Sequence, residues 1–225
     1  MVPGLRLVNL KIVLYSTAMI EPKSRRAENR EARRNCIVAA ARDAFLEQGY
    51  AATSMSTIAT QLGGSKGTLW AYFPSKEDLF AAVLDDVTAS FRENLEDALR
   101  PGRDCRTTLF DFAERFLLKI VNPDSLRLHR LIVGEGGRFP EIGHIFYARG
   151  PKIVVDRLSD YIRQRIAAGD LRQEDPIQAA RNLIQLAQME QNLRLWGVLS
   201  NVPTTEMIHA HAANAVDVFM RAYAA

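Results

Sequence analysis

Cysteine is scarce in this sequence, and its two copies stand far apart. Cys36 and Cys105 are the only cysteines among 225 residues, and neither has metal-ligand spacing around it. A reducing cytoplasm is therefore the simplest location for the protein. Redox sensing by Cys36 is one hypothesis, but we expect a small buried helix residue there.

Long hydrophobic runs are also lacking, and no stretch of the sequence is long enough to span a membrane as a helix. Residues 1–20 are apolar with Arg6 and Lys11, which superficially resembles a secretory signal. However, the apolar run from Ile12 is short, and no clear small-residue cleavage site follows it. We therefore expect either a natural start at Met19 or a tail without fixed structure.

The sequence offers no constellation for catalysis. It has no ordered nucleophile, base and orienting group, and no carboxylate pair with a defensible catalytic role. His209 and His211 lie two positions apart, so on a helix they diverge and do not readily bind one metal ion. We expect no enzymatic activity, no metal site and no cofactor.

Basic residues are concentrated in the first part of the chain. Residues 1–78 hold 11 Lys or Arg and 7 Asp or Glu, whereas residues 79–225 hold 18 and 19. The densest run is KSRRAENREARR, residues 23–34. Two interpretations stay open for this run. It is either a solvated arm, or it adds phosphate or minor-groove contacts beside a DNA-binding motif.

A helix-turn-helix pattern follows the basic run. Apolar residues recur three or four positions apart over residues 55–62, which predicts a short helix, and Ser54 can cap its start. Gly63 can take the left-handed conformation that ends this helix. A second short helix is predicted over residues 66–73, and Pro74 ends it.

The second short helix has distinct inner and outer faces. Leu69 and Phe73 lie four positions apart and can face inward. A helix of this length does not persist alone in water, so packing must hold it. The outward residues are Lys66, Thr68, Ala71 and Tyr72. This small, hydrogen-bonding surface with one cation and no acid suits a DNA major groove.

Two other structures could produce the same pattern. The first is an ordinary helical hairpin whose serines, threonines and glycines only form caps and turns. The second is a phosphate-binding loop, because residues 63–68 are rich in glycine and include a lysine. A phosphate loop needs Gly-Lys-Ser/Thr after a strand, whereas the order here is Ser-Lys-Gly-Thr after an amphipathic helix. We therefore favour DNA binding.

The pattern resembles the DNA-binding signature of the tetracycline-repressor (TetR) family. The resemblance is carried by Gly49, Tyr50, Thr53, Ile58, Ala59, Gly63, residues 65–69, Tyr72, Phe73 and residues 75–77. It implies that Lys66 and Thr68 contact bases or nearby phosphates, and that Tyr72 and Lys76 contact the DNA backbone. The predicted DNA-binding residues are Ser54, Ser65, Lys66, Gly67, Thr68, Trp70, Tyr72 and Lys76.

The sequence departs from this signature at two positions. Gly64 stands where the family commonly has valine, and Trp70 stands where it commonly has tyrosine. The second change puts the usual tyrosine contact to a phosphate in doubt. An indole N–H can still donate one hydrogen bond.

We predict an all-α protein with three parts. These are a disordered or basic arm over residues 1–30, a helix-turn-helix DNA-binding domain over residues 31–91, and a helical ligand-binding and dimerisation domain over residues 92–225. Apolar periodicity and breakers place further helices at about residues 33–48, 75–100, 106–121, 176–195 and 205–223.

Residues 127–151 resemble the C-terminal domains of AcrR-like and AefR-like members of the family. Glu135, residues 138–141 and residues 146–147 carry this resemblance, which implies a cavity for a small effector. The candidate lining residues are Phe112, Phe116, His129, Phe139, Phe146, Met189 and Trp196. Ordinary core packing is the alternative for each of them.

The last two predicted helices each carry two apolar stripes, and a helix that is apolar on two faces needs two partners. We predict that one face meets its own core and the other meets a second subunit, as a homodimer through a four-helix bundle. The sequence thus predicts a ligand-responsive repressor that binds a pseudo-palindromic operator in double-stranded DNA. The alternative is a helical small-molecule-binding protein or enzyme with a vestigial DNA-binding motif.

Overall fold

The structure, a computed structural model, describes residues 25–63, 66–100, 102–188 and 190–225. The predictions for residues 1–24, Gly64, Ser65 and Met189 lie outside these described residues, as does the side chain of Lys66. Within them the chain forms helices and no strand, with one isolated bridge between Leu171 and Ala224. The all-α prediction is confirmed.

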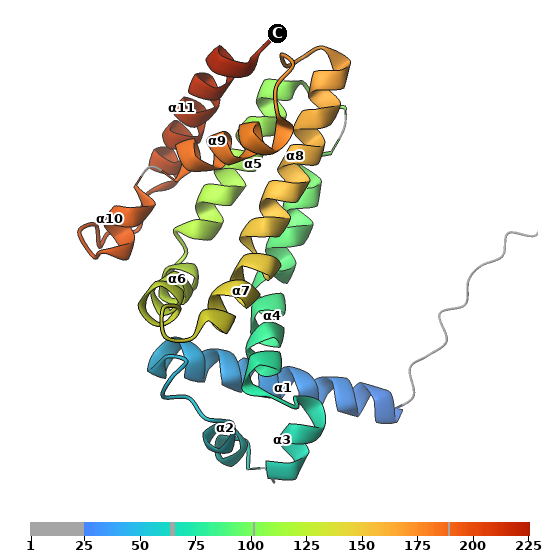
Figure 1. The fold of residues 1–225 in the computed structure, drawn as a ribbon, viewed down its shortest axis with the longest axis vertical. Helices are drawn as coiled ribbons and strands as arrows, with labels where there is room; N and C mark the ends of the chain where they lie inside the picture. The colour runs from blue at the N-terminus through green and yellow to red at the C-terminus, as the bar shows by residue number, and fades with distance from the viewer. Residues whose placement is uncertain (1–24, 64–65, 101, 189) are drawn as a thin grey trace, which may run out of the picture.

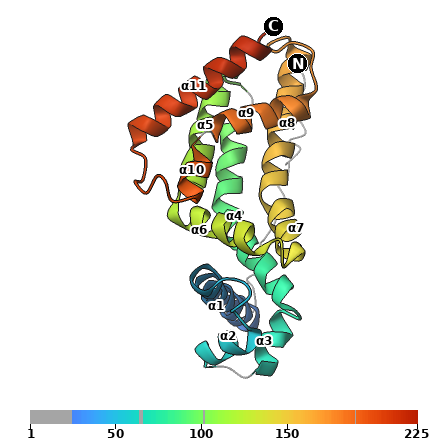
Figure 2. The ribbon, with the colours of Figure 1, turned by 60° about the vertical axis from the view of Figure 1, so that its left-hand side comes forward.

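Figure 1 shows two lobes joined by one long helix. The lower lobe holds α1 (Arg25–Gln48), α2 (Met55–Gln61) and α3 (Lys66–Tyr72), and α4 (Lys76–Ala98) rises from it. The upper lobe holds α5 (Cys105–Ile120), α6 (Pro123–Glu135), α7 (Pro140–Arg149), α8 (Pro151–Ala168), α9 (Pro176–Ala187), α10 (Gln191–Leu195) and α11 (Thr205–Tyr223). In Figure 2 the lower lobe again lies at the far end of α4 from α11.

Side-chain caps begin the helices where the sequence predicts them. Ser54 accepts the backbone N–H of Thr57 at 3.0 Å, and Ser75 accepts that of Asp78 at 3.0 Å. Each cap satisfies a backbone donor that has no partner inside the helix. These local bonds fix where α2 and α4 start.

α1 begins earlier than predicted, at Arg25 rather than near residue 33. The basic run consists mainly of Arg, Glu and Ala, which are good helix formers, and Glu28 lies in the first turn, where the helix dipole favours a carboxylate. Residues 25–30, assigned to the arm, therefore form the first turns of α1. Cys36 of this helix is exposed, so the expectation of a buried residue there is wrong; Ile37 and Val38 are the side chains that enter the core.

The core of the lower lobe is centred on three buried rings. Phe45, Tyr50 and Phe80 have ring centroids 5.2 to 5.7 Å apart, with both stacked and edge-on pairs. Such pairs stabilise beyond the area they bury. Leu131 of α6 and Ile142 of α7 join this same core, so the upper lobe packs directly on the lower lobe.

α4 contributes to both cores. Its first half, through Leu84, packs in the lower core, whereas Phe91 and Leu95 pack in the upper one. The predicted domain boundary at residue 91 therefore falls within α4, a helix whose residues pack in both cores. A shift of α4 would be felt in both lobes because interiors this closely packed transmit displacement.

The helix predicted over residues 176–195 is two helices. α9 ends at Ala187, and α10 starts at Gln191. No proline or glycine explains this break. Instead, Gln191 turns inward and its Nε2 donates to the carbonyl oxygen of Ile120 at 3.3 Å. A tertiary contact here overrides helix propensity.

The two apolar stripes of α9 are both used within the protomer. Ala179 and Leu183 are buried, and so are Ala180 and Ile184, because α9 is packed against both α8 and α11. On α11 the stripe with Val216 packs in the upper core as well. The exposed residues that share one face of α11 are Met207, Ala210, Asn214 and Val218.

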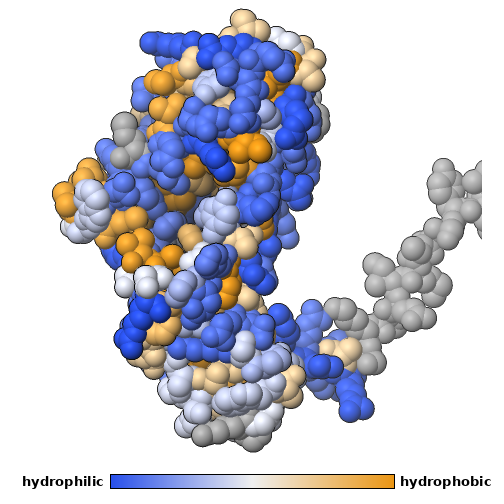
Figure 3. All heavy atoms as spheres, in the orientation of Figure 1, coloured by the Kyte–Doolittle hydropathy of each residue, from blue (hydrophilic) through white to orange (hydrophobic). Residues whose placement is uncertain are grey.

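Apolar side chains also gather on and after α10. Trp196 is 72% exposed, and Val198 and Val202 are exposed too. Figure 3 shows hydrophobic surface at the left edge, where Figure 1 places α10. In the described part of the chain, none of the helices is both long and apolar enough to cross a bilayer.

Candidate nucleic-acid interface and ligand cavity

The outer face of α3 agrees only in part with the prediction: Thr68 and Ala71 are exposed, but Tyr72 is half-buried against the lower core. Leu69 and Phe73 are 2% and 4% exposed, so they anchor the helix in the lower core. Gly67, Thr68 and Ala71 are exposed on the opposite side. The helix therefore presents these small residues outward together with Trp70, which is 39% exposed, at the end of the molecule most distant from α11 (Figure 1).

Arginines of α1 hold the helix-turn-helix unit. Arg33 donates to the carbonyl oxygen of Leu62 at 3.3 Å, which satisfies the C-terminal end of α2. The guanidinium of Arg34 lies 5.3 Å from the ring centroid of Phe73, and that of Arg30 lies 5.9 Å from the ring of Tyr72. Part of the basic run thus positions α2 and α3.

Lys76 is engaged with the loop between α1 and α2. Its ammonium group donates to the carbonyl oxygen of Tyr50 and lies 4.0 Å from the centroid of that ring. Burial lowers the pKa of Lys76, and the neighbouring carboxylate of Glu135 opposes this shift. The Tyr50 hydroxyl donates to Glu77 at 3.2 Å, and its pKa is raised by burial and by that carboxylate.

A cavity of about 350 Å³ lies between the two lobes. Its wall is mostly apolar and includes Val83, Val87, Phe91, Phe116, Phe146 and Val154. Arg42 and Leu46 of α1 also line it. A mainly apolar cavity of this size with a few polar groups is typical of a small-molecule site.

Polar groups enter this cavity from α5 and α6. The ammonium group of Lys119 donates to the carbonyl oxygen of Val87 at 2.6 Å, and burial lowers its pKa. His129 packs edge-on against Phe146 with ring centroids 5.0 Å apart. Burial lowers the pKa of His129, which favours its neutral form.

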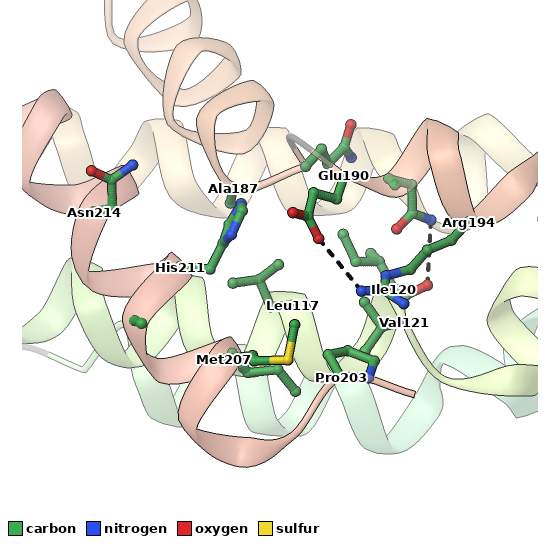
Figure 4. Close-up of a pocket in the computed structure, with 14 residues that line it drawn as sticks. Leu117, Ile120, Val121, Ala187, Glu190, Arg194, Pro203, Met207, His211 and Asn214 are labelled. Atoms are coloured by element: carbon green, nitrogen blue, oxygen red, sulfur yellow. Dashed lines mark hydrogen bonds and ion pairs between the residues drawn. The ribbon is translucent and has the colours of Figure 1, made fainter. Parts of the chain in front are cut away.

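A second cavity, of about 370 Å³, lies between α5, α9, α10 and α11. Figure 4 shows Leu117 of α5 between Met207 and His211 of α11, with Arg194 and Glu190 beyond. Arg194 pairs with Glu190 at 3.5 Å. Met207, with Ala210 and Asn214, belongs both to this lining and to the exposed face of α11.

Two family profiles match the chain. One, described as bacterial regulatory proteins of the tetR family, matches residues 37–83. The other, the C-terminal domain of AefR-like transcriptional repressors, matches residues 107–225, more than half of the chain. The chain belongs to the TetR family. The helix-turn-helix resemblance and the AefR-like resemblance are both confirmed.

Relatives agree with this membership. FasR, an HTH-type transcriptional activator of Mycolicibacterium smegmatis, is 36% identical over 92 residues, which are 38% of this chain and 42% of FasR. The alignment therefore spans less than half of FasR. The similarity of this TetR-family protein to FasR, a transcriptional regulator, is thus limited to the 92 aligned residues.

Solved structures match over most of their length. A TetR-family transcriptional regulator from Mesorhizobium loti is 27% identical with a TM-score of 0.76, covering 87% of this chain and 99% of that one. FrrA, a flavonoid-responsive regulator, is 33% identical with a TM-score of 0.73, covering 86% and 98%. These matches confirm the predicted TetR-family fold and the predicted class, a transcriptional regulator.

The effector residues expected from the sequence of this TetR-family protein fall in different places. Phe116, His129 and Phe146 line the cavity between the lobes. Phe112 is fully buried in the upper core, and Phe139 packs on Tyr50 in the lower core with ring centroids 5.4 Å apart. Trp196 is exposed at the end of α10.

Sequence reasoning missed the charged and α4 residues of this cavity. Lys119 is the clearest of the missed residues. The sequence feature that could have identified it is its position on the apolar face of α5, three residues after Phe116. A lysine within a buried stripe is unusual unless it has a partner. Among the described residues no cluster of His, Cys, Asp and Glu could hold a metal ion.

Proposed function

We propose that this TetR-family protein is a ligand-responsive repressor that binds a pseudo-palindromic operator as a homodimer. One observation carries the proposal: helices of the DNA-binding unit also line the cavity. Arg42 and Leu46 come from α1, and Val83 and Val87 come from α4. A ligand there would contact the helices that hold α2 and α3, so its affinity would depend on their position. By linkage, it would then change the affinity for DNA.

DNA recognition is assigned to α3 and its surroundings. The exposed Gly67 and Thr68 would face the major groove together with Lys66, while Trp70 and Tyr72 would lie toward the phosphates. Trp70 is 39% exposed, which leaves its indole N–H able to reach a backbone oxygen. In a dimer, two copies of α3 about 34–36 Å apart would read successive major grooves on one side of the duplex.

The dimer interface is assigned to the exposed face of α11 and to α10. Met207 and Val218 lie eleven residues apart on that face, three helical turns, and both are more than 40% exposed. Trp196 extends the apolar surface. Exposed apolar side chains of this kind are typical of subunit contacts, and a two-fold pair would bury the same face of both copies.

The relatives support a response to a small molecule but differ in its direction. FrrA is named a flavonoid-responsive regulator, whereas FasR is named an activator. The match over residues 107–225 is to repressors, and the repressor assignment follows this longer match. We also propose a bacterial cytoplasmic location, because that is where the operator DNA lies.

Selection of bound sequences from a randomised duplex library at near-physiological salt tests the proposal. This salt concentration matters because phosphate contacts dominate the binding at low salt. We expect enrichment of an inverted repeat. Only sequence-blind, salt-sensitive binding would overturn the repressor assignment and favour a small-molecule-binding protein with a vestigial DNA-binding motif.

A further inference from the structure

The cation of Lys119 lies in the cavity without an acidic partner. Its ammonium group donates to the backbone carbonyl of Val87, and it forms no ion pair with a carboxylate among the described residues. Asp124, the acid that acts on it electrostatically, is already paired with Arg127 at 2.6 Å. A partly buried ammonium without a counter-charge is costly, because its desolvation is not compensated.

The cavity around Lys119 has an excess of positive charge. Lys119 and Arg181 line it, against the single lining carboxylate of Asp124; Arg42 lines it too but is paired with Asp43 at 3.2 Å. His129 adds no charge near neutral pH because its burial favours the neutral ring. A low-dielectric wall focuses such a field and attracts an anion. A cationic ligand would meet like charges there.

The remaining wall is mainly apolar and aromatic, with Thr88, Ser125, Gln185 and Gln188 as its uncharged polar side chains besides His129. Phe91, Phe116 and Phe146 contribute from α4, α5 and α7, and Val154 contributes from α8. This surface can bury the body of a hydrophobic ligand but supplies few hydrogen bonds. Lys119 has three N–H donors, of which Val87 uses one. The unused donors suit a carboxylate, which accepts at two oxygens.

We propose that the cavity binds a hydrophobic molecule with a single carboxylate, and that the ammonium group of Lys119 binds this carboxylate. The inference rests on the proposed function, because it names the class of effector for the same cavity. A ligand of this class would supply the missing counter-charge of Lys119 and bury its apolar body against the phenylalanines.

Matched pairs of probes test the proposal in the full-length protein by calorimetric titration. The pairs are decanoate with decanol, and naphthoate with naphthylmethanol, so that only the charged group differs within each pair. We expect at least one acid to bind about ten-fold or more tightly than its alcohol, since charge-assisted hydrogen bonds are strong. Equal affinities, or no binding of either acid, would overturn the proposal.

Substitutions assign the preference to Lys119. In Lys119→Met, the acid should no longer bind more tightly than its matched alcohol, and the affinity for the alcohol should change by less than about two-fold. In Lys119→Arg, the acid should still bind more tightly than the alcohol. Lys152→Met is the matched control, because Lys152 is an exposed lysine paired with Asp156 on α8. Wild-type affinity for the alcohol shows that Lys119→Met is folded. If this folded variant still bound the acid more tightly than the alcohol, the assignment of the carboxylate to Lys119 would be overturned.

Operator binding separates this inference from the proposed function. If an acid binds through Lys119 but leaves DNA affinity unchanged, the ligand class stands and the regulatory role fails. If an acid releases the DNA equally from wild type and Lys119→Met, the regulatory role stands and the assignment of Lys119 fails.

Discussion

The carboxylate of Glu135 accepts the backbone N–H of Ala51 at 2.6 Å. Its other oxygen accepts the N–H of Tyr50 at 2.9 Å, so one side chain at the end of α6 holds the loop that precedes α2. The same helix carries Leu128 and His129 into the wall of the cavity between the lobes. α6 therefore connects the cavity wall to the helix-turn-helix unit through a charge-assisted pair of hydrogen bonds.

Glu135→Gln is expected to weaken this connection. An amide keeps one acceptor oxygen but places a donor against the second backbone N–H, so one hydrogen bond is lost. The free energy of unfolding should fall by about 1–3 kcal/mol, measured by urea denaturation. Glu93→Gln, at an exposed position of α4, is the control and should be neutral. Superimposable unfolding curves for all three proteins would contradict the role of Glu135.

Gly49→Ala should destabilise the same junction for a second reason. Gly49 has a φ of 85°, and a Cβ there would lie 2.4 Å from Oε1 of Glu135. We expect the left-handed conformation alone to cost about 1–2 kcal/mol, with a further loss as the carboxylate moves. Thermal unfolding measures the effect. Gly143→Ala on α7 meets open space and should be neutral or slightly stabilising, so equal melting temperatures for the two variants would refute the expectation.

The elements that sequence predicts well are those with local causes. Ser54 and Ser75 cap helices three residues from the N–H groups they accept, and Leu69 and Phe73 share a face because they lie four apart. Spacing in the sequence contains this information directly. The helix-turn-helix unit was therefore predicted almost completely, apart from the early start of α1.

The parts that were missed depend on contacts between distant residues. Periodicity marks Phe139 and Phe146 equally as apolar, yet Phe139 packs on Tyr50 and only Phe146 lines the cavity. Glu135 and Tyr50 are 85 residues apart, and nothing local pairs them. Likewise, α9 shows two apolar stripes, but the sequence does not say that α8 and α11 cover both.

Lys76→Ala should weaken binding to all DNA sequences alike and lower the salt slope by about one, because a phosphate contact carries no sequence information. Lys66→Ala should also relax base preference. Fluorescence anisotropy at several salt concentrations, on selected and random duplexes, measures both. Since Lys76 also holds the carbonyl of Tyr50, its variant should lose some stability. If Lys76→Ala lost stability but kept the wild-type salt slope, Lys76 would contact only the loop and not a DNA phosphate.

Val218→Glu should dissociate the proposed dimer. Val218 is 41% exposed on the face of α11 that also carries Met207, and a two-fold interface through this face would bury an unpaired carboxylate from each copy in an apolar contact. Sedimentation velocity at micromolar concentration should show a dimer for wild type and a monomer for the variant, with much weaker operator binding because each monomer contacts one half-site. Tyr147→Glu is the control, since Tyr147 is 51% exposed on α7, which packs mainly against α4 and α8. A monomeric wild type, or a variant that stays dimeric, would show that this face of α11 is not the subunit contact.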